Sequence, residues 1–216
     1  MSATTRYAAM SRRAAMTAAA LTAMVALAGC NSGGTGAAAE GDMAMGAPEG
    51  AKVTVVEYAS VACHACAGWN DQVWPEFKAK YVDTNKVRYV FREIPTPPAE
   101  VAVAGFLIAR CAGPDKYFDV VHELLASQDE MRGDPRATLF RVGNGAGLSN
   151  ERIQQCITDE AALAAAEERA QAALDAGVEG TPTFFVNGTK VMTPGSQSGA
   201  SLEDLSKAIE AELAKD

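Results

Sequence analysis

Two cysteines spaced two residues apart, where a strand pattern gives way to a helix pattern, constrain this chain more than any other feature. The stretch Ser60–Ala67 reads SVACHACA and contains Cys63 and Cys66. The β-branched run before it, Lys52–Ala59 (KVTVVEYA), predicts a buried strand. The segment after it, Ala67–Tyr81 (AGWNDQVWPEFKAKY), repeats its large apolar residues at helical intervals. We therefore predict that the pair lies at the N-terminus of a helix that directly follows a strand.

This position suits a reactive thiol. The first backbone N–H groups of a helix are unpaired and the helix dipole is positive there, so an anionic thiolate at Cys63 is stabilised. Each unit by which its pKa falls is worth about 1.4 kcal/mol in favour of the thiolate. A structural disulfide gains nothing from this environment. Pro75, inside the helix pattern, lacks an N–H group and predicts a kink.

A metal site is the first alternative for the pair. A structural zinc ion usually needs four ligands in two close pairs, whereas the five cysteines and two histidines of this chain include one close pair. His64 lies between the two thiols, where it is awkwardly placed as a third ligand to the same ion. His122, in the helical pattern KYFDVVHELL, is interpreted as a helix-face residue. We predict no dedicated metal site; soft Cu(I) is the ion that such a pair would favour.

The N-terminal segment predicts export. Arginines 6, 12 and 13 precede the uncharged apolar run Ala14–Ala28, which is shorter than the roughly twenty residues of a membrane span, so residues 1–29 are predicted to be a signal peptide. Leu27–Cys30 (LAGC) resembles a bacterial lipobox, which implies a lipid on Cys30; after plain cleavage Cys30 would be a spare thiol instead. Residues 30–50 are rich in Gly and Ala without a hydrophobic period and predict a flexible tether before a domain at 51–216. The predicted location is the periplasm, lipid-anchored to a bacterial membrane or soluble without the lipid.

Two distant motifs together resemble a known family. VTVVEYASVACHAC, followed more than a hundred residues later by Gly180–Gly188 (GTPTFFVNG), closely resembles the thioredoxin-fold thiol–disulfide oxidoreductases of the DsbA-like class. The resemblance extends from about Gly46 to the C-terminus. It implies an α/β thioredoxin fold, a cis bond before Pro182 facing the active-site disulfide, and no cofactor other than the redox-active pair Cys63–Cys66.

The elements expected from the residues follow the order of that fold. Strands are predicted at Lys52–Tyr58 and Lys86–Glu93, and a helix from Cys63 to about Val82. A hairpin of Thr183–Asn187 and Lys190–Met192 turns at Asn187-Gly188, and a last helix, Ser201–Ala214, has Ser201 as its N-cap. Helix-start signals at Pro97, Pro114, Asp134, Ser149 and Asp159 lie between the two halves. They match the helical insertion, here about 97–177, that the resemblance implies.

The resemblance also implies roles for individual residues. Cys66 would be the buried resolving thiol, and Glu57 a buried acid that helps to move the Cys66 proton; otherwise Glu57 is a surface carboxylate on a strand. His64 departs from the family pattern, in which a histidine precedes the second cysteine, but we expect it near the Cys63 sulfur. Thr181 and Pro182 would bind an extended substrate peptide.

Cys111 and Cys156 remain after the redox pair and Cys30. They are either two inert core thiols or, as the resemblance implies for an oxidising compartment, a structural disulfide. By the chain-entropy model, a bridge closing roughly 45 residues contributes about 4 kcal/mol.

The resulting hypothesis is an exported protein thiol:disulfide oxidoreductase that introduces disulfides. Its partners would be reduced or misoxidised extracytoplasmic polypeptides and a membrane redox partner that resets the pair, and we expect a monomer. With 27 acidic and 19 basic residues, nucleic acid is excluded as a partner. The alternatives are a reductase or isomerase of the same fold, a Cu(I)-handling module, and a holdase without redox turnover. Thr181 leaves the direction open, whereas GTPTFFVNG favours an enzyme, because metal capture requires no peptide-docking loop.

Overall fold

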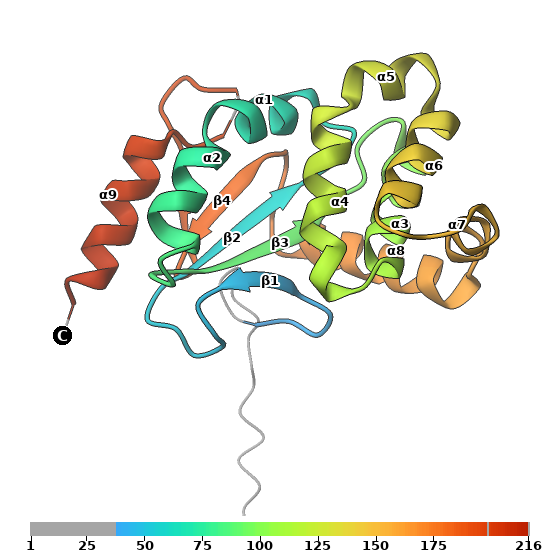
Figure 1. The fold of residues 1–216 in the computed structure, drawn as a ribbon. Coiled ribbons are helices and arrows are strands. Elements are labelled where there is room, and N and C mark those ends of the chain that lie inside the picture. The colour runs from blue at the N-terminus through green and yellow to red at the C-terminus, as the bar shows by residue number, and fades with distance from the viewer. Residues whose placement is uncertain (1–37, 198, 216) are drawn as a thin grey trace, which may run out of the picture. The chain divides into compact units, whose positions relative to one another are not determined.

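The computed structural model describes residues 38–197 and 199–215, so the predicted signal peptide, Cys30 and the start of the predicted tether lie outside the described residues. Within the described part, the chain forms an α/β fold around a five-stranded sheet (Figure 1). The strands are β1 (Met43–Gly46), β2 (Thr54–Ala59), β3 (Arg88–Glu93), β4 (Thr183–Val186) and β5 (Thr189–Val191). Their order across the sheet is β1-β3-β2-β4-β5; β2 and β3 are parallel, and the other neighbours are antiparallel.

Strand β1 corrects the prediction of a tether over residues 30–50. Met43 pairs with Phe91 of β3, and the preceding Asp42 forms a 2.8 Å ion pair with Arg92. Met43 and Met45 are two residues apart, so they lie on the same face of the strand, where both pack against the hydrophobic core. The tether prediction relied on the Gly and Ala content of the segment and overlooked this short apolar alternation.

The predicted first helix is divided into three pieces. Helix α1 (His64–Gln72) is followed by α2 (Trp74–Phe77) and a π-helical turn, η1 (Lys78–Val82). The break falls at Val73, whose φ is -115°. The predicted kink is confirmed: Pro75 has no N–H group and its ring would meet the carbonyl four residues earlier.

Six helices separate β3 from β4. They are α3 (Ala99–Cys111), α4 (Pro114–Ala126), α5 (Gln128–Gly133), α6 (Pro135–Gly145), α7 (Asn150–Ile157) and α8 (Glu160–Asp175), and α9 (Leu202–Leu213) follows β5. Four of the predicted helix starts have a capping side chain that accepts a hydrogen bond from a backbone N–H three residues later. These N-caps are Asp134, Ser149, Asp159 and Ser201. The short helix α5 was not predicted, because its sequence, QDEMRG, carries no apolar period.

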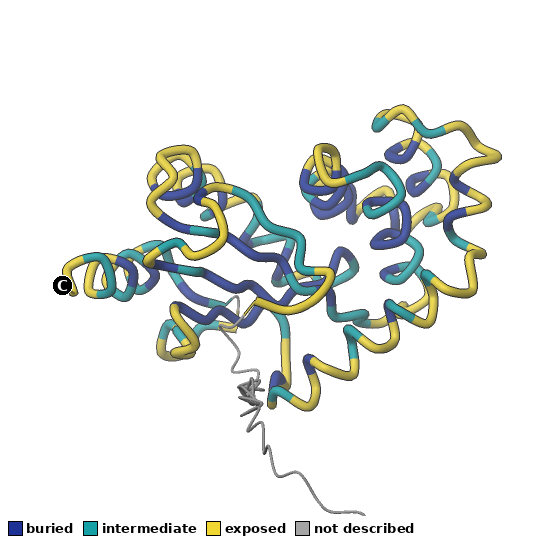
Figure 2. Tube along the Cα trace, turned by 90° about the horizontal axis from the view of Figure 1, so that it is seen from below, coloured by how far each residue is buried: buried dark blue, intermediate teal, exposed yellow. Residues whose placement is uncertain are grey.

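The sheet has two differently covered faces. Alternate strand residues, among them Val55, Phe91 and Phe184, belong to the main core with side chains of α1, α2, α3, α4 and α9. The other face, with Val56 and Phe185, packs against residues at the end of α8. Figure 2 shows the buried positions concentrated along the strands and the inward sides of the helices. In the described part of the chain, no helix has the length and apolarity needed to cross a membrane.

Candidate active site

Cys63 lies at the junction of β2 and α1, as the pattern predicts. It is the N-cap of α1, and its Sγ accepts a hydrogen bond from the backbone N–H of Cys66 at 3.2 Å. The same sulfur lies 3.4 Å from the carbonyl oxygen of Thr181, to which a thiol would donate. Cys63 is partly buried and Cys66 fully buried, and both are free thiols. One sulfur therefore faces outward at the helix N-terminus while the other lies within the core.

The two thiols have opposite acidities. The pKa of Cys63 is lowered to about 6, first by its hydrogen bond with the Cys66 side chain and further by hydrogen bonds with the Thr181 side chain and with backbone groups of Cys66 and Ala65, which together outweigh its burial. Burial raises the pKa of Cys66, and the neighbouring Cys63 raises it further. At neutral pH Cys63 is the thiolate and Cys66 keeps its proton.

The segment before β4 faces the cysteines. The Thr181-Pro182 peptide bond is cis, as the resemblance implies, and a second cis bond, Pro97-Pro98, was not predicted. The loop after β5 closes over Pro182 so tightly that a Cβ at Gly199 would lie 2.8 Å from the proline ring. The carbonyl of the preceding residue, Thr181, is the one that lies 3.4 Å from the Cys63 sulfur.

Glu57 lies on the core face of β2, close enough to the redox pair to interact electrostatically with both cysteines. Its side chain is 2% exposed and accepts a hydrogen bond from the Tyr89 hydroxyl. Burial is the main reason that its pKa rises to about 8; the charge of Cys63 adds to the rise, and the bond from Tyr89 opposes it. Glu57 is therefore not a surface carboxylate, and it is mostly neutral at pH 7. Sequence reasoning missed Tyr89, although its position two residues before Phe91 places it on the same face of β3.

The two histidines differ in environment. His64, the first residue of α1, is exposed, and among the described residues its ring has no hydrogen-bond partner. His122 of α4 is largely buried and stacks on Trp74 with ring centroids 4.4 Å apart, while its Nδ1 lies 2.5 Å from Oδ1 of Asn70. Burial lowers the pKa of His122 to about 4. In the described part of the chain, no three His, Cys, Asp or Glu side chains gather at a place that could hold a metal ion.

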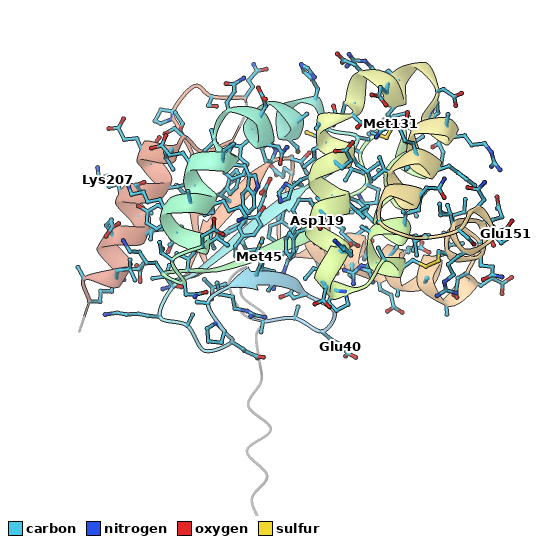
Figure 3. The ribbon with its side chains drawn as sticks, viewed as in Figure 1. Glu40, Met45, Asp119, Met131, Glu151 and Lys207 are labelled. Atoms are coloured by element: carbon cyan, nitrogen blue, oxygen red, sulfur yellow. A yellow bond between two sulfur atoms is a disulfide. The ribbon has the colours of Figure 1, made fainter. Side chains whose placement is uncertain are left out.

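Cys111 and Cys156 are joined by a disulfide within the helical insertion. It links the last residue of α3 to α7, across a sequence separation of 45 residues (Figure 3). The alternative of two inert core thiols is therefore wrong. The structure places this disulfide in the helical insertion and the redox pair at the end of β2, so the two pairs lie on separate parts of the fold.

Comparisons with known proteins agree with this geometry. Residues 38–211 match the family model described as Thioredoxin. A relative from Rickettsia bellii, named as a protein-disulfide oxidoreductase, is 31% identical over 175 residues that cover 79% of this chain and 66% of the relative. The chain thus spans slightly less than two thirds of that relative.

Solved structures share the fold at lower identity. BdbD from Bacillus subtilis, in its oxidised form, has a TM-score of 0.73 at 19% identity, over 84% of this chain and 98% of that chain. Alpha-DsbA1 from Wolbachia pipientis has a TM-score of 0.70 at 23% identity, over 81% of this chain and 92% of that chain. The α/β architecture with its helical insertion is therefore the fold of these proteins.

Proposed function

The chain belongs to the thioredoxin family, and on that premise we propose that it is an exported thiol:disulfide oxidoreductase that introduces disulfides into extracytoplasmic proteins. One observation carries the proposal. The Cys63 sulfur is accessible at the N-cap of α1, has a lowered pKa, and lies 3.4 Å from the carbonyl of the residue before the cis-proline. A thiol with this acidity is a good leaving group in disulfide exchange.

Oxidation of a substrate proceeds through two exchange steps. A substrate thiolate attacks Sγ of Cys63 in the oxidised pair, and the bond between Cys63 and Cys66 breaks as the mixed disulfide forms. Cys66 leaves with the electron pair and takes a proton, for which the neutral carboxyl of Glu57 is the donor in this proposal. A second substrate thiolate then attacks the substrate sulfur and expels Cys63 as a thiolate. Two electrons pass from the substrate thiols to the pair.

The segment at Thr181 and Pro182 is the proposed docking place for the substrate. An extended peptide that pairs with the backbone of Thr181 would lie across the Cys63 sulfur as a short added strand. The backbone bonds bind substrates without selecting their side chains, which suits an enzyme that acts on many unfolded chains.

The proposed setting is the periplasm. Substrates are reduced or misoxidised polypeptides, and a membrane redox partner reoxidises the pair. The protein acts as a monomer, with its own disulfide as redox group, and the lipid on Cys30 keeps it at a membrane. The support for export and anchoring is the pattern of residues 1–30, which lie outside the described residues.

The reduction potential of the Cys63–Cys66 pair tests this function. The protein is equilibrated with glutathione buffers and its free thiols are trapped and counted by mass spectrometry, with Cys63→Ser as the control that cannot form the pair. A potential of about -180 mV or higher is expected for a dithiol oxidase. A value near about -270 mV would reverse the direction and indicate a reductase. A protein whose pair does not exchange with glutathione would overturn the enzymatic proposal.

A further inference from the structure

A buried side chain of the helical insertion reaches the backbone of the redox loop. Gln128, the first residue of α5, is 7% exposed, and its Nε2 donates hydrogen bonds to the carbonyl oxygens of Val61 at 2.8 Å and Cys63 at 2.9 Å. We propose that Gln128 is a positioning residue of the redox site, which holds these two carbonyls and so fixes the Cys63 sulfur at the N-cap of α1. The inference rests on the redox function proposed above and identifies a residue that positions Cys63, the sulfur that the substrate attacks and later expels as a thiolate.

The Gln128 amide completes the hydrogen bonding of both carbonyls. Val61 is fully buried, where a carbonyl without a partner is unfavourable. The Cys63 carbonyl already accepts the first helical bond, from the N–H of Ala67 at 3.1 Å, and Gln128 supplies its second donor. Gln128 therefore fixes the peptide unit that follows the Cys63 Cα, at the residue whose sulfur must face the N–H of Cys66.

The rest of the loop is held from another side. The buried hydroxyl of Ser60 accepts hydrogen bonds from the N–H of Ala62 at 3.3 Å and from the N–H of Thr96 at 3.2 Å, in the segment after β3. Those bonds fix the start of the loop and do not involve the carbonyls of Val61 and Cys63, to which Gln128 donates. The loop between β2 and α1 is thus tied both to the segment that leaves the sheet and to the helical insertion.

Gln128 lies at the junction of α4 and α5, which is fixed by side-chain contacts. The neighbouring Ser127 is buried, and its hydroxyl accepts a hydrogen bond from Arg141 of α6 at 2.7 Å. Arg141 also contacts Glu123 of α4 at 2.9 Å and Glu130 of α5 at 2.8 Å. One turn beyond Gln128, Met131 packs into the main core; it marks α5 in Figure 3. These contacts fix the backbone around Gln128, and so the position from which its amide reaches the redox loop.

The expected consequence of losing this amide is a weaker N-cap at Cys63. Without the bond to its carbonyl, the Cys63 peptide unit can rotate, and the alignment of its sulfur with the N–H of Cys66 loosens. The lowered pKa of Cys63 depends on hydrogen bonds from α1, so the thiolate should become less stable. A residue that merely filled space would leave the acidity of Cys63 unchanged.

Two substitutions of similar size test the inference in the intact protein. Gln128→Met keeps the length of the side chain without its donors, and Gln128→Glu replaces the donors by an acceptor when ionised. Gln155→Met, at an exposed position of α7, is the matched control. The Cys63 thiolate is titrated by its absorbance at 240 nm and by its rate of alkylation with iodoacetamide, and urea unfolding is measured in parallel.

We expect Gln128→Met to raise the pKa of Cys63 by about half a unit, equivalent to about 0.7 kcal/mol, and to slow alkylation at pH 5 about threefold. Gln128→Glu should also raise it, because a protonated carboxyl can donate to only one of the two carbonyls and an ionised one adds negative charge near the thiolate. Gln155→Met should match the wild type.

The outcomes separate this inference from the proposed function. If a folded Gln128→Met protein, less stable or not, titrates as the wild type does, the positioning role is refuted while the redox function stands. If Gln128→Met does not fold, the titration of Gln128→Glu takes its place, and an unchanged pKa of Cys63 in that variant refutes the positioning role. If the wild-type pair does not exchange with glutathione, the redox function fails, and the titration still decides whether Gln128 sets the acidity of Cys63.

Discussion

Replacing Glu57 by glutamine should change how the stability of the protein depends on pH. The pKa of Glu57 rises from 4.5 to about 8 on folding. Above pH 4.5 the unfolded chain therefore releases a proton that the folded protein retains. With the folded pKa above the unfolded one, the stability linked to this group is fully present below pH 4.5 and is lost as the pH rises through about 8.

The size of the effect follows from the two pKa values. At about 1.36 kcal/mol per pKa unit, the linkage removes about 3 kcal/mol from the free energy of unfolding between roughly pH 5 and pH 8. Glu57 is 2% exposed, so solvent screening does not reduce this figure appreciably. Glutamine retains an acceptor for the Tyr89 hydroxyl and does not ionise. The free energy of unfolding of Glu57→Gln should therefore lack this pH-dependent decrease over the same pH range.

The experiment requires the oxidised protein. In the reduced protein the lowered pKa of Cys63 has the opposite effect on stability. It increases the free energy of unfolding as the pH rises from about 6 toward 9. Burial, the largest cause of the Glu57 shift, persists when the pair is oxidised. Urea unfolding is followed at several pH values by the fluorescence of Trp69 and Trp74, which are both buried. Glu76→Gln, at an exposed position of α2, is the control and should follow the wild type.

If the wild type and Glu57→Gln give parallel curves of unfolding free energy against pH, Glu57 does not retain a proton on folding. Its proposed part in moving the Cys66 proton would then be withdrawn, because an ionised carboxylate has no proton to give.

Further predictions concern three other sites. His122→Phe should reduce the loss of stability between pH 6.5 and 4 in urea unfolding, because the lowered pKa of His122 favours the unfolded chain as the pH falls through this range. Cys66→Ser should accumulate a mixed disulfide of Cys63 with glutathione, visible by mass spectrometry, and rapid release of that adduct would contradict the resolving role of Cys66. Replacing both Cys111 and Cys156 by alanine should lower the free energy of unfolding by about 4 kcal/mol and leave the Cys63 titration unchanged.

Local signals made much of the fold predictable. The hairpin of β4 and β5 follows from Asn187-Gly188, where both residues have positive φ, 46° and 80°, as a tight hairpin turn requires. Helix starts follow from capping residues such as Ser201, and the break before α2 from Pro75. The junction of β2 and α1 could be predicted because a run of β-branched residues is followed directly by apolar residues at helical spacing. Each of these features depends on residues close together in sequence.

Tertiary contacts account for what the sequence did not reveal. Strand β1 has four residues and depends on pairing with β3, so its own segment gives only a weak signal. Gln128 contacts residues 65 and 67 positions away. No pattern around it distinguishes it from a surface glutamine. Tyr89 is an intermediate case: strand periodicity places it on the core face, but only the register with β2 shows that it meets Glu57.

The acidity of Cys63 alone does not make the pair a strong oxidant. Lowering its pKa from 9.0 to about 6 would favour the reduced form at pH 7 by about 1.4 kcal/mol. Because the sulfur is partly exposed, solvent screening reduces this free energy to about 1 kcal/mol. That free energy corresponds to a rise in reduction potential of about 20 mV. Thioredoxin and DsbA differ by about 150 mV. A potential at the oxidising end of this range would therefore require an oxidised pair that is itself destabilised by several kcal/mol. Such a protein should unfold in less urea when oxidised than when reduced, the reverse of the usual effect of a disulfide.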